Sequence, residues 1–206
     1  MRMTLLPSES RIASPWKNGK GVTREIAAFP MGATIDAFEW RVSIADVSEG
    51  GAFSNFPNID RLLAALDGTI RLQIGGEAPV TLVPGTNPIA FAGDIPCRAD
   101  IPDGAARDLN VMTRRGCFMS RMTLVEADGV LRFPENARTI ILVALFDLNI
   151  RIAETLIALK PLDAVRFDPP LPGEARLHCD RSLAGRKGLY SIALFQDQVA
   201  ARGQTR

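Results

Sequence analysis

The sequence has very few of the residues that bind transition metals. Its 206 residues include one histidine, His178. Catalytic zinc usually takes three protein ligands drawn from His, Glu, Asp or Cys, and non-haem iron commonly takes two histidines and a carboxylate. A histidine-rich metal centre within this chain is therefore excluded, and we expect no metal and no other cofactor. His178 has no second histidine nearby, which favours a structural or surface role for it.

The motifs of covalent catalysis and phosphate binding are also absent. A serine or cysteine nucleophile needs a base that a third group orients, and His178 is the only imidazole available. There is no GxSxG elbow and no GxGxxG loop, and the GKG at 19–21 lacks the Walker spacing. No catalytic residue is assigned on these grounds, and a binding protein is favoured over an enzyme.

The chain carries no large excess of charge of either sign. It has 24 basic and 23 acidic residues, a formal net charge of +1, which provides no field to attract nucleic acid or an anionic membrane.

The sequence also lacks the signals of export and membrane insertion. Its cysteines, Cys97, Cys117 and Cys179, form no CxxC pair. The longest apolar run, 140–146, is far shorter than the roughly 20 residues of a membrane helix. No signal peptide is evident. We expect a cytoplasmic protein without nucleic-acid or membrane partners, and a homodimer remains open.

What the sequence does contain is the two-residue period of β-strands. Apolar and polar side chains alternate over residues 38–47 and again over 69–74. Residues 60–66 favour a buried strand over a short helical turn. Turn signals rich in glycine and proline recur about every ten to fifteen residues, as in a sandwich or barrel. The chain is therefore predicted to be all-β.

Two segments, one in each half of the chain, resemble each other. Leu82 and Pro84 in LVPGTNPIAF have counterparts in Leu159 and Pro161 of LKPLDAVRF. Each segment follows two strand-like stretches, as in the strand–turn–strand step of cupin barrels; coincidence between two β-rich halves is the alternative. We predict a cupin-like (RmlC-like jelly roll) double barrel with two fused lobes. Residues 1–206 would form one compact bicupin-like unit, with an N-terminal lobe of about 1–125 and a C-terminal lobe of about 126–206.

Polar residues gather in three segments of the first half. In the segment 16–25, one interpretation is that the glycines let the backbone approach a ligand and that Trp16 covers this ligand. The alternative interpretation is that the segment is an exposed turn followed by an edge strand. In 38–47, Arg41 lies on the face opposite Trp40, where it is solvated in an open sheet. If both faces are covered, Arg41 needs a carboxylate or an anionic ligand, because an unpaired buried charge is costly.

The third polar segment is 107–116. Asp108, Asn110 and Met112 share one face of its predicted strand, so their side chains point into the same space, either the lumen of a barrel or solvent. Arg114 and Arg115, at the end of the segment, are expected to form a solvated strand end.

Four blocks of the sequence together resemble the HutD/Ves family. They are WKNGKGVTREI at 16–26, FEWRVSIADVSEGGAFSNFPNIDRLLAALDG at 38–68, FAGD at 91–94 and RDLNVMTRRG at 107–116. The resemblance implies a cupin-like, two-lobed β fold without a bound metal. It also implies a link to bacterial histidine utilisation, where the family is thought to restrain the pathway by binding an intermediate such as urocanate or formylglutamate. No enzymatic activity is established for the family.

The resemblance also indicates which side chains would surround the ligand. With Arg24 added for its charge, the candidate ligand-binding residues are Trp16, Asn18, Thr23, Arg24, Glu25, Trp40, Arg41, Ser43, Phe53, Ser54, Arg61, Asp108, Asn110 and Met112. The chain departs from the family pattern at two positions. Lys20 stands where the family usually has glycine, and we expect it to narrow or charge the mouth of the pocket. Asn58 stands where a glycine commonly follows FP.

The leading hypothesis is a metal-free protein that senses or buffers a small carboxylate metabolite of the urocanate or formylglutamate class and modulates histidine utilisation. The pocket would lie in the N-terminal lobe. The carboxylate would pair with one or two arginines among Arg24, Arg41 and Arg61. An amide-like group would be recognised by Asn18, Ser43 or Asn110.

Two other classes of function remain open. The first is a metal-independent isomerase or lyase that acts on a small acid, with Glu25, Glu39 or Asp108 as general base. The second is a protein-interaction module, which would present a broad exposed apolar patch instead of a deep polar pocket.

Overall fold

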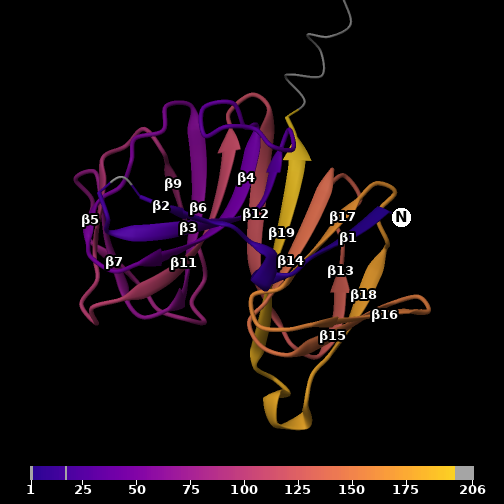
Figure 1. Cartoon of the computed structure of the whole chain (residues 1–206). Coiled ribbons are helices and arrows are strands. Elements are labelled where there is room, and N and C mark those ends of the chain that lie inside the picture. The colour runs from indigo at the N-terminus through magenta and orange to yellow at the C-terminus, as the bar shows by residue number, and fades with distance from the viewer. Residues whose placement is uncertain (1, 17, 198–206) are drawn as a thin grey trace, which may run out of the picture. The chain divides into compact units, whose positions relative to one another are not determined.

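The computed structural model describes residues 2–16 and 18–197, whose regular secondary structure is almost entirely β-strand (Figure 1). The strands of the first part of the chain are β1 (Arg2–Leu6), β2 (Ala13–Pro15), β3 (Gly21–Phe29), β4 (Trp40–Val47), β5 (Gly51–Ala52), β6 (Ile59–Asp67), β7 (Ile70–Ile74), β8 (Val80–Leu82), β9 (Ile89–Ala92), β10 (Cys97–Asp100) and β11 (Ala106–Arg114). Those of the second part are β12 (Phe118–Glu126), β13 (Gly129–Arg132), β14 (Thr139–Ala144), β15 (Leu148–Ile152), β16 (Thr155–Leu159), β17 (Ala164–Asp168), β18 (Glu174–His178) and β19 (Lys187–Gln196). Two short 3-10 segments cover Ser8–Ser10 and Arg181–Leu183.

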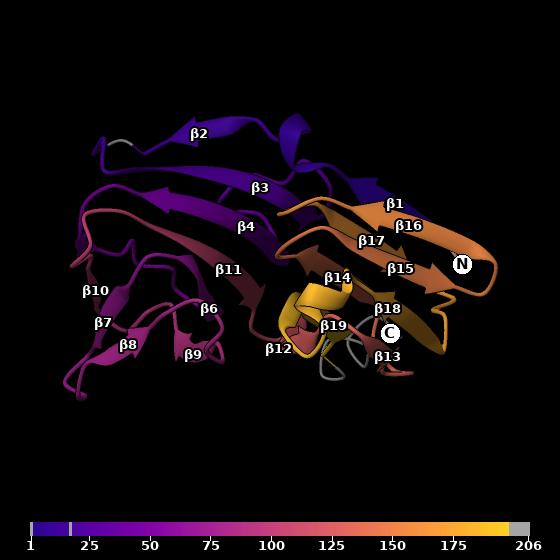
Figure 2. The ribbon, with the colours of Figure 1, turned by 90° about the horizontal axis from the view of Figure 1, so that it is seen from below.

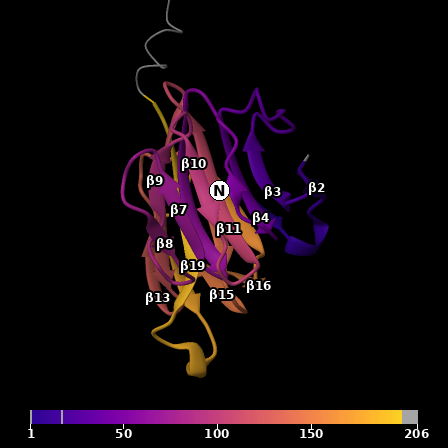
Figure 3. The ribbon, with the colours of Figure 1, turned by 90° about the vertical axis from the view of Figure 1, so that its left-hand side faces the viewer.

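The strands form two compact units, each with two antiparallel sheets. Residues 11–119 with Asp197 make the first unit, and 2–10 with 120–196 make the second. The sheets of the first unit have the orders β2-β3-β4-β11-β6-β9 and β5-β10-β7-β8. Figure 2 shows β2, β3, β4 and β11 in succession across the larger sheet, and the smaller sheet can be followed through β10 and β7 in Figure 3. The sheets of the second unit are β1-β17-β14-β19-β12 and β13-β18-β15-β16.

The two units repeat the same topology, eight strands apart. The order β4-β11-β6-β9 in the first unit corresponds to β12-β19-β14-β17 in the second, and β5-β10-β7-β8 corresponds to β13-β18-β15-β16. The two similar segments of the sequence occupy equivalent places, since Pro84 follows β8 and Pro161 follows β16. The all-β, two-lobed jelly-roll prediction is therefore confirmed. The N-terminal strand β1 belongs to the second unit, where it pairs with β17.

Each unit has an apolar core built by alternating strand residues. In the first unit, Leu63 and Ala65 of β6 pack with Ile70 and Leu72 of β7, and all four are at most 1% exposed. The strand predicted over 60–66 is thus confirmed. The core of the second unit is built in the same way by β14 to β19. Among the described residues, no helix is long and apolar enough to cross a membrane.

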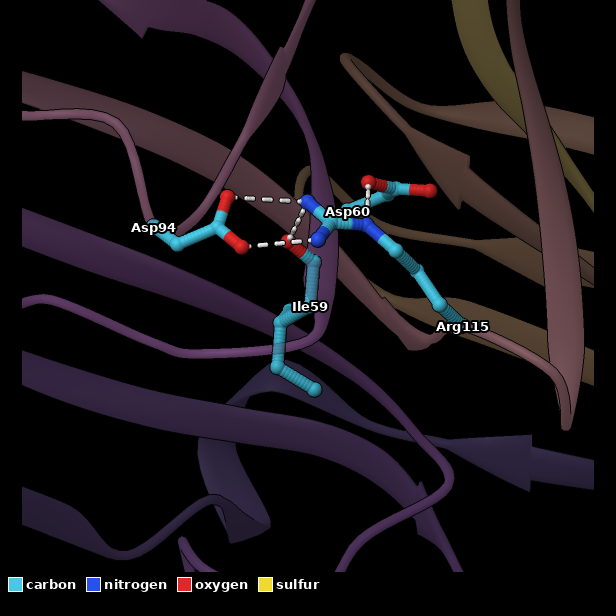
Figure 4. Close-up of polar contacts among 4 residues, drawn as sticks. All are labelled: Ile59, Asp60, Asp94 and Arg115. Carbon is cyan, nitrogen blue, oxygen red and sulfur yellow. Dashed lines mark hydrogen bonds and ion pairs between the residues drawn. The ribbon is translucent and has the colours of Figure 1, made fainter.

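Arg115 ties the turn after β11 to β6 and to the segment after β9 (Figure 4). Its guanidinium donates to both oxygens of Asp94 at 2.7 and 3.0 Å, to Asp60 Oδ1 at 2.7 Å and to the Ile59 carbonyl at 3.3 Å. Hydrogen bonds from Arg115 lower the pKa of Asp94 to about 2. The expectation of a merely solvated strand end is wrong for Arg115, which remains exposed but has three partners. It is also wrong for Arg114, which donates to the carbonyls of Asp36 and Phe38.

Arg115→Ala should release Asp94 and return its pKa toward the ordinary value of a carboxyl group, about 4. A carboxylate whose pKa is lowered by folding stabilises the protein above its unfolded pKa, and this stabilisation is lost as the pH falls toward its folded pKa. The variant should therefore be less stable than the parent at neutral pH, with the difference disappearing near pH 2. Carboxyl NMR titration and chemical denaturation measure both effects. Arg98→Ala, at an exposed position of β10, is the control, and an unchanged Asp94 titration in Arg115→Ala would contradict the assignment.

Candidate functional site

A cavity of about 550 Å³ lies in the first unit, over one face of the six-stranded sheet. Small-molecule sites usually have volumes of roughly 300–1,000 Å³. The strands β2, β3, β4, β5, β6 and β11 contribute side chains, as do the turn after β2 and the loops after β3 and β5. The lining residues are Ser14, Pro15, Trp16, Asn18, Thr23, Ile35, Arg41, Ser43, Ala45, Ala52, Phe53, Ser54, Phe56, Arg61, Asp108, Asn110 and Met112.

The middle of the cavity floor is formed by β11. Asp108, Asn110 and Met112 all line the cavity, as their alternation in the sequence predicted. The strand register places Arg41 of β4 on one side of Met112 and Arg61 of β6 on the other. Two arginines therefore flank one end of the floor, and Asp108 lies at the other end.

Arg61 is a buried cation without an ion-pair partner among the described residues. It is 6% exposed, and its Nε atom has no hydrogen-bond acceptor. The guanidinium carbon lies over three aromatic rings, 4.9 Å from the Phe53 centroid, 5.1 Å from Phe91 and 5.8 Å from Phe56. Burial lowers the pKa of Arg61, which the negative charge of Asp108 opposes. A buried, unpaired charge is costly, and an anion in the cavity beside Arg61 would offset this cost.

Asp108 is the buried carboxyl group of the cavity, with 3% of its surface exposed. Burial raises its pKa to about 7; the Arg61 guanidinium opposes this shift and the charge of Asp46 adds to it. Its Oδ1 atom has no hydrogen-bond partner in the part of the chain that the structure describes. Of the three carboxylates that could serve as a general base, Asp108 alone is part of the lining, and Glu25 and Glu39 are not.

Arg41 has a carboxylate partner beside the cavity. Its Nε donates to Glu25 Oε2 at 2.8 Å, and its side chain is 15% exposed. The other face of β4 is covered as well, because Trp40 is only 1% exposed. Arg41 therefore meets the requirement that the sequence suggested for a covered strand, and Glu25 holds Arg41 without lining the cavity itself.

Two candidate residues lie on the opposite face of the sheet. Arg24 pairs with Asp46, which also accepts from Arg107 Nε at 2.5 Å. Burial alone would raise the pKa of Asp46, but the hydrogen bonds from Arg107 and Arg24 outweigh it and lower that pKa. Trp40 stacks on Phe29, with ring centroids 6.2 Å apart. Neighbouring residues of a strand point to opposite faces, so neither side chain reaches the cavity beside Thr23 and Arg41.

The turn between β2 and β3 builds one wall of the cavity. Trp16 Nε1 donates to Thr23 Oγ1 at 2.7 Å, which fixes the indole beside β3. A Cβ atom on Gly21 would lie 2.7 Å from the Asp46 carbonyl and 3.0 Å from the Trp16 ring. Gly19 has a φ of +72°, in the left-handed region that favours glycine. The turn and the packing of Trp16 thus explain both glycines.

The structure also accounts for the two departures from the family pattern. Lys20 forms an ion pair with Glu49 at 2.5 Å and does not line the cavity, contrary to the expectation that it would modify the mouth of the pocket. Asn58 has a φ of +61°, in the left-handed region that favours glycine, which explains the glycine at this position in the family. Asparagine can replace it because it tolerates this region better than most residues. Its carbonyl accepts from the Arg115 backbone N–H at 2.9 Å.

The cavity therefore gathers most of the candidate residues, and Arg24, Glu25 and Trp40 lie outside it. Sequence reasoning missed Ser14, Pro15, Ile35, Ala45, Ala52 and Phe56. Ala45 continues the alternation of Arg41 and Ser43 and could have been found from it, whereas loop residues such as Ile35 and Phe56 have no periodic signal. The described residues contain no group of three or more His, Cys, Asp or Glu side chains that could hold a metal ion.

Two jelly-roll units in one chain, with a cavity in one of them, define a cupin-like protein. A solved bacterial pirin from Escherichia coli in complex with nickel(II) has the same fold, with a TM-score of 0.62 at 10% identity over 95% of this chain and 99% of that chain. The chain belongs to the HutD family, which matches residues 8–184.

The relatives agree with this assignment. The structure of HutD from Pseudomonas fluorescens SBW25 covers 95% of this chain and 100% of its own, with a TM-score of 0.79 and 28% identity. An uncharacterised 21.2 kDa protein in the hutC 3′ region of Pseudomonas putida is 34% identical over 69% of this chain and 74% of its own length. Protein Ves from Cronobacter sakazakii is 41% identical over 48% of this chain and 54% of its own length. The expected HutD/Ves resemblance is confirmed.

Proposed function

We propose that this protein binds a small carboxylate metabolite of the urocanate or formylglutamate class in a metal-free pocket and thereby modulates histidine utilisation in the cytoplasm. The link to this pathway is supported by the name HutD of one relative and by the position of another in a hutC region. The three cysteines, Cys97, Cys117 and Cys179, are free thiols, which suits a reducing compartment.

The observation that carries the proposal is the unpaired guanidinium of Arg61 in the cavity. Arginine binds carboxylates through charge-assisted, often bidentate hydrogen bonds. The rings of Phe53, Phe56 and Phe91 surround the cation and contribute no competing acceptor of comparable strength. A ligand carboxylate would supply the missing anion.

The rest of the lining suits a small molecule with a flat or apolar middle. Phe53, Phe56 and Met112 provide apolar surface near Arg61. The indole of Trp16, which is hydrogen-bonded to Thr23, contributes a further part of the cavity lining. Sites for small metabolites typically combine such surface with a few polar groups that fix orientation. Ser43 and Asn110 are polar groups of this kind beside the arginines.

Isothermal titration calorimetry with urocanate, N-formylglutamate and glutamate tests the proposal. We expect saturable binding of at least one of the first two compounds. A thermal shift that grows with ligand concentration should accompany it, because a ligand that binds only the folded protein stabilises that state. Flat titrations with all three compounds at millimolar concentration would overturn the proposed ligand class.

A further inference from the structure

The cavity floor holds two acceptor atoms without donors. Asp108 Oδ1 and Asn110 Oδ1 are both buried, and neither has a hydrogen-bond partner among the described residues. Buried polar atoms in native proteins are almost always hydrogen-bonded, so two unsatisfied acceptors in one cavity need an explanation. A cavity that binds a ligand with N–H groups provides one.

Strand geometry directs both acceptors toward the same space. Asp108 and Asn110 are two residues apart on β11, and both side chains line the cavity. Asp108 lies between Ala45 of β4 and Ala65 of β6. The methyl groups of these alanines are short and donate no hydrogen bond, so the carboxyl group of Asp108 stands between neighbours that cannot satisfy it.

The acceptors are separated from the cationic end of the floor. Met112, which Arg41 and Arg61 flank, lies two residues beyond Asn110 and four beyond Asp108. At roughly 3.4 Å per strand residue, these backbone separations are about 7 and 14 Å, and the long arginine side chains can shorten them. One small molecule can therefore reach from Arg61 to the acceptors.

We propose that Asp108 and Asn110 are specificity-determining residues that accept N–H hydrogen bonds from the ligand. The pocket would then select molecules with a carboxylate at one end and an N–H group, such as an imidazole or an amide, at the other. This inference rests on the proposed function, which assigns the ligand's carboxylate to Arg61. Above pH 7, where Asp108 is ionised, a simple dicarboxylate is a poor match, because its second carboxylate would place a like charge against Asp108 without offering a donor.

Matched pairs of compounds test the inference in the intact protein. Urocanate is compared with 3-(furan-3-yl)acrylate, whose ring has an oxygen and no N–H, and N-formylglutamate is compared with its N-methyl derivative. Sites built to hydrogen-bond a polar group discriminate strongly against analogues that lack it. In at least one pair, we expect the N–H compound to bind at least about tenfold more tightly than its partner in calorimetric titrations.

Two leucine variants locate the origin of this preference. Asp108→Leu and Asn110→Leu each remove an acceptor and keep the number and branching of the side-chain heavy atoms, so the ratio of the two affinities should fall toward one. Asn149→Leu, at an exposed position of β15, is the control and should keep the ratio of the wild type. The comparison in the wild type stands even if a leucine variant fails to fold.

The outcomes separate this inference from the proposed function. If both members of each binding pair bind equally well to the wild type, the carboxylate site stands and the role of Asp108 and Asn110 is overturned. An unchanged ratio in both folded leucine variants overturns that role as well. If no compound of either pair binds, the proposed function fails, and the inference fails with it.

Discussion

Arg61→Met is expected to weaken binding of the carboxylate ligand by at least about 30-fold without destabilising the free protein. Removing one partner of a buried, charged contact costs about 2–5 kcal/mol of binding free energy. In the free protein, by contrast, Arg61 has no ion-pair partner to lose among the described residues, and the surrounding rings of Phe53, Phe56 and Phe91 form an environment that suits a thioether. The affinity for the ligand should therefore fall, while the free energy of unfolding of the free protein should not decrease.

Calorimetry with the best ligand and chemical denaturation without ligand measure these two quantities. Arg71→Met, at an exposed position of β7, is the matched control and should change neither. Arg61→Lys keeps the charge but not the bidentate geometry, so its affinity should fall between those of the wild type and Arg61→Met. Full affinity in a folded Arg61→Met protein would show that Arg61 is not the anchor of the carboxylate.

The floor of this cavity was predictable because strand alternation is a local property of the sequence. The period of two that places Asp108, Asn110 and Met112 on one face of β11 also places Arg41 and Ser43 together on β4. The internal repeat was predictable for a similar reason, since each jelly-roll unit needs its own alternating core strands. Stricter use of alternation would also have removed Arg24 and Trp40 from the candidates, because each neighbours a residue that faces the cavity.

The pairing of charged groups was not predictable. Arg115 meets Asp60 and Asp94, which are 55 and 21 positions away in the sequence. Nothing in a single sequence specifies which of the many carboxylates an arginine will meet, because that depends on sheet order and register. The same holds for Glu25. Alternation places it on the same face of β3 as Thr23, but it does not predict the ion pair with Arg41, which forms next to a register shift in β3.

The loops were the other missing part of the site. Ile35 and Phe56 line the cavity from segments without regular structure, where no period relates one side chain to the next. The unpaired state of Arg61 was also inaccessible to sequence reasoning. It depends on whether any described carboxylate lies within ion-pair distance of the guanidinium, which is known only when the surrounding strands have been placed.

Asp108→Asn is expected to stabilise the free protein by about 2–4 kcal/mol at pH 8 and to have little effect at pH 4. The pKa of this carboxyl group is about 7 in the folded protein and 3.8 in its ordinary state. Between these values the folded protein retains a proton that the unfolded chain has released. The free energy of unfolding therefore falls as the pH rises through this window, and asparagine, which resembles the protonated acid, removes this loss.

Denaturation followed by tryptophan fluorescence reports on the relevant unit, because both tryptophans, Trp16 and Trp40, lie in it. Asp100→Asn, whose parent side chain is 64% exposed, is the control and should show the pH dependence of the wild type. Equal stability of the wild type and Asp108→Asn at pH 8 would show that Asp108 ionises without cost. If the stabilisation is found, the protein retains a destabilising carboxylate in its cavity. A residue retained at such a cost is expected to act in recognition of the ligand, since replacement by asparagine would otherwise improve the fold.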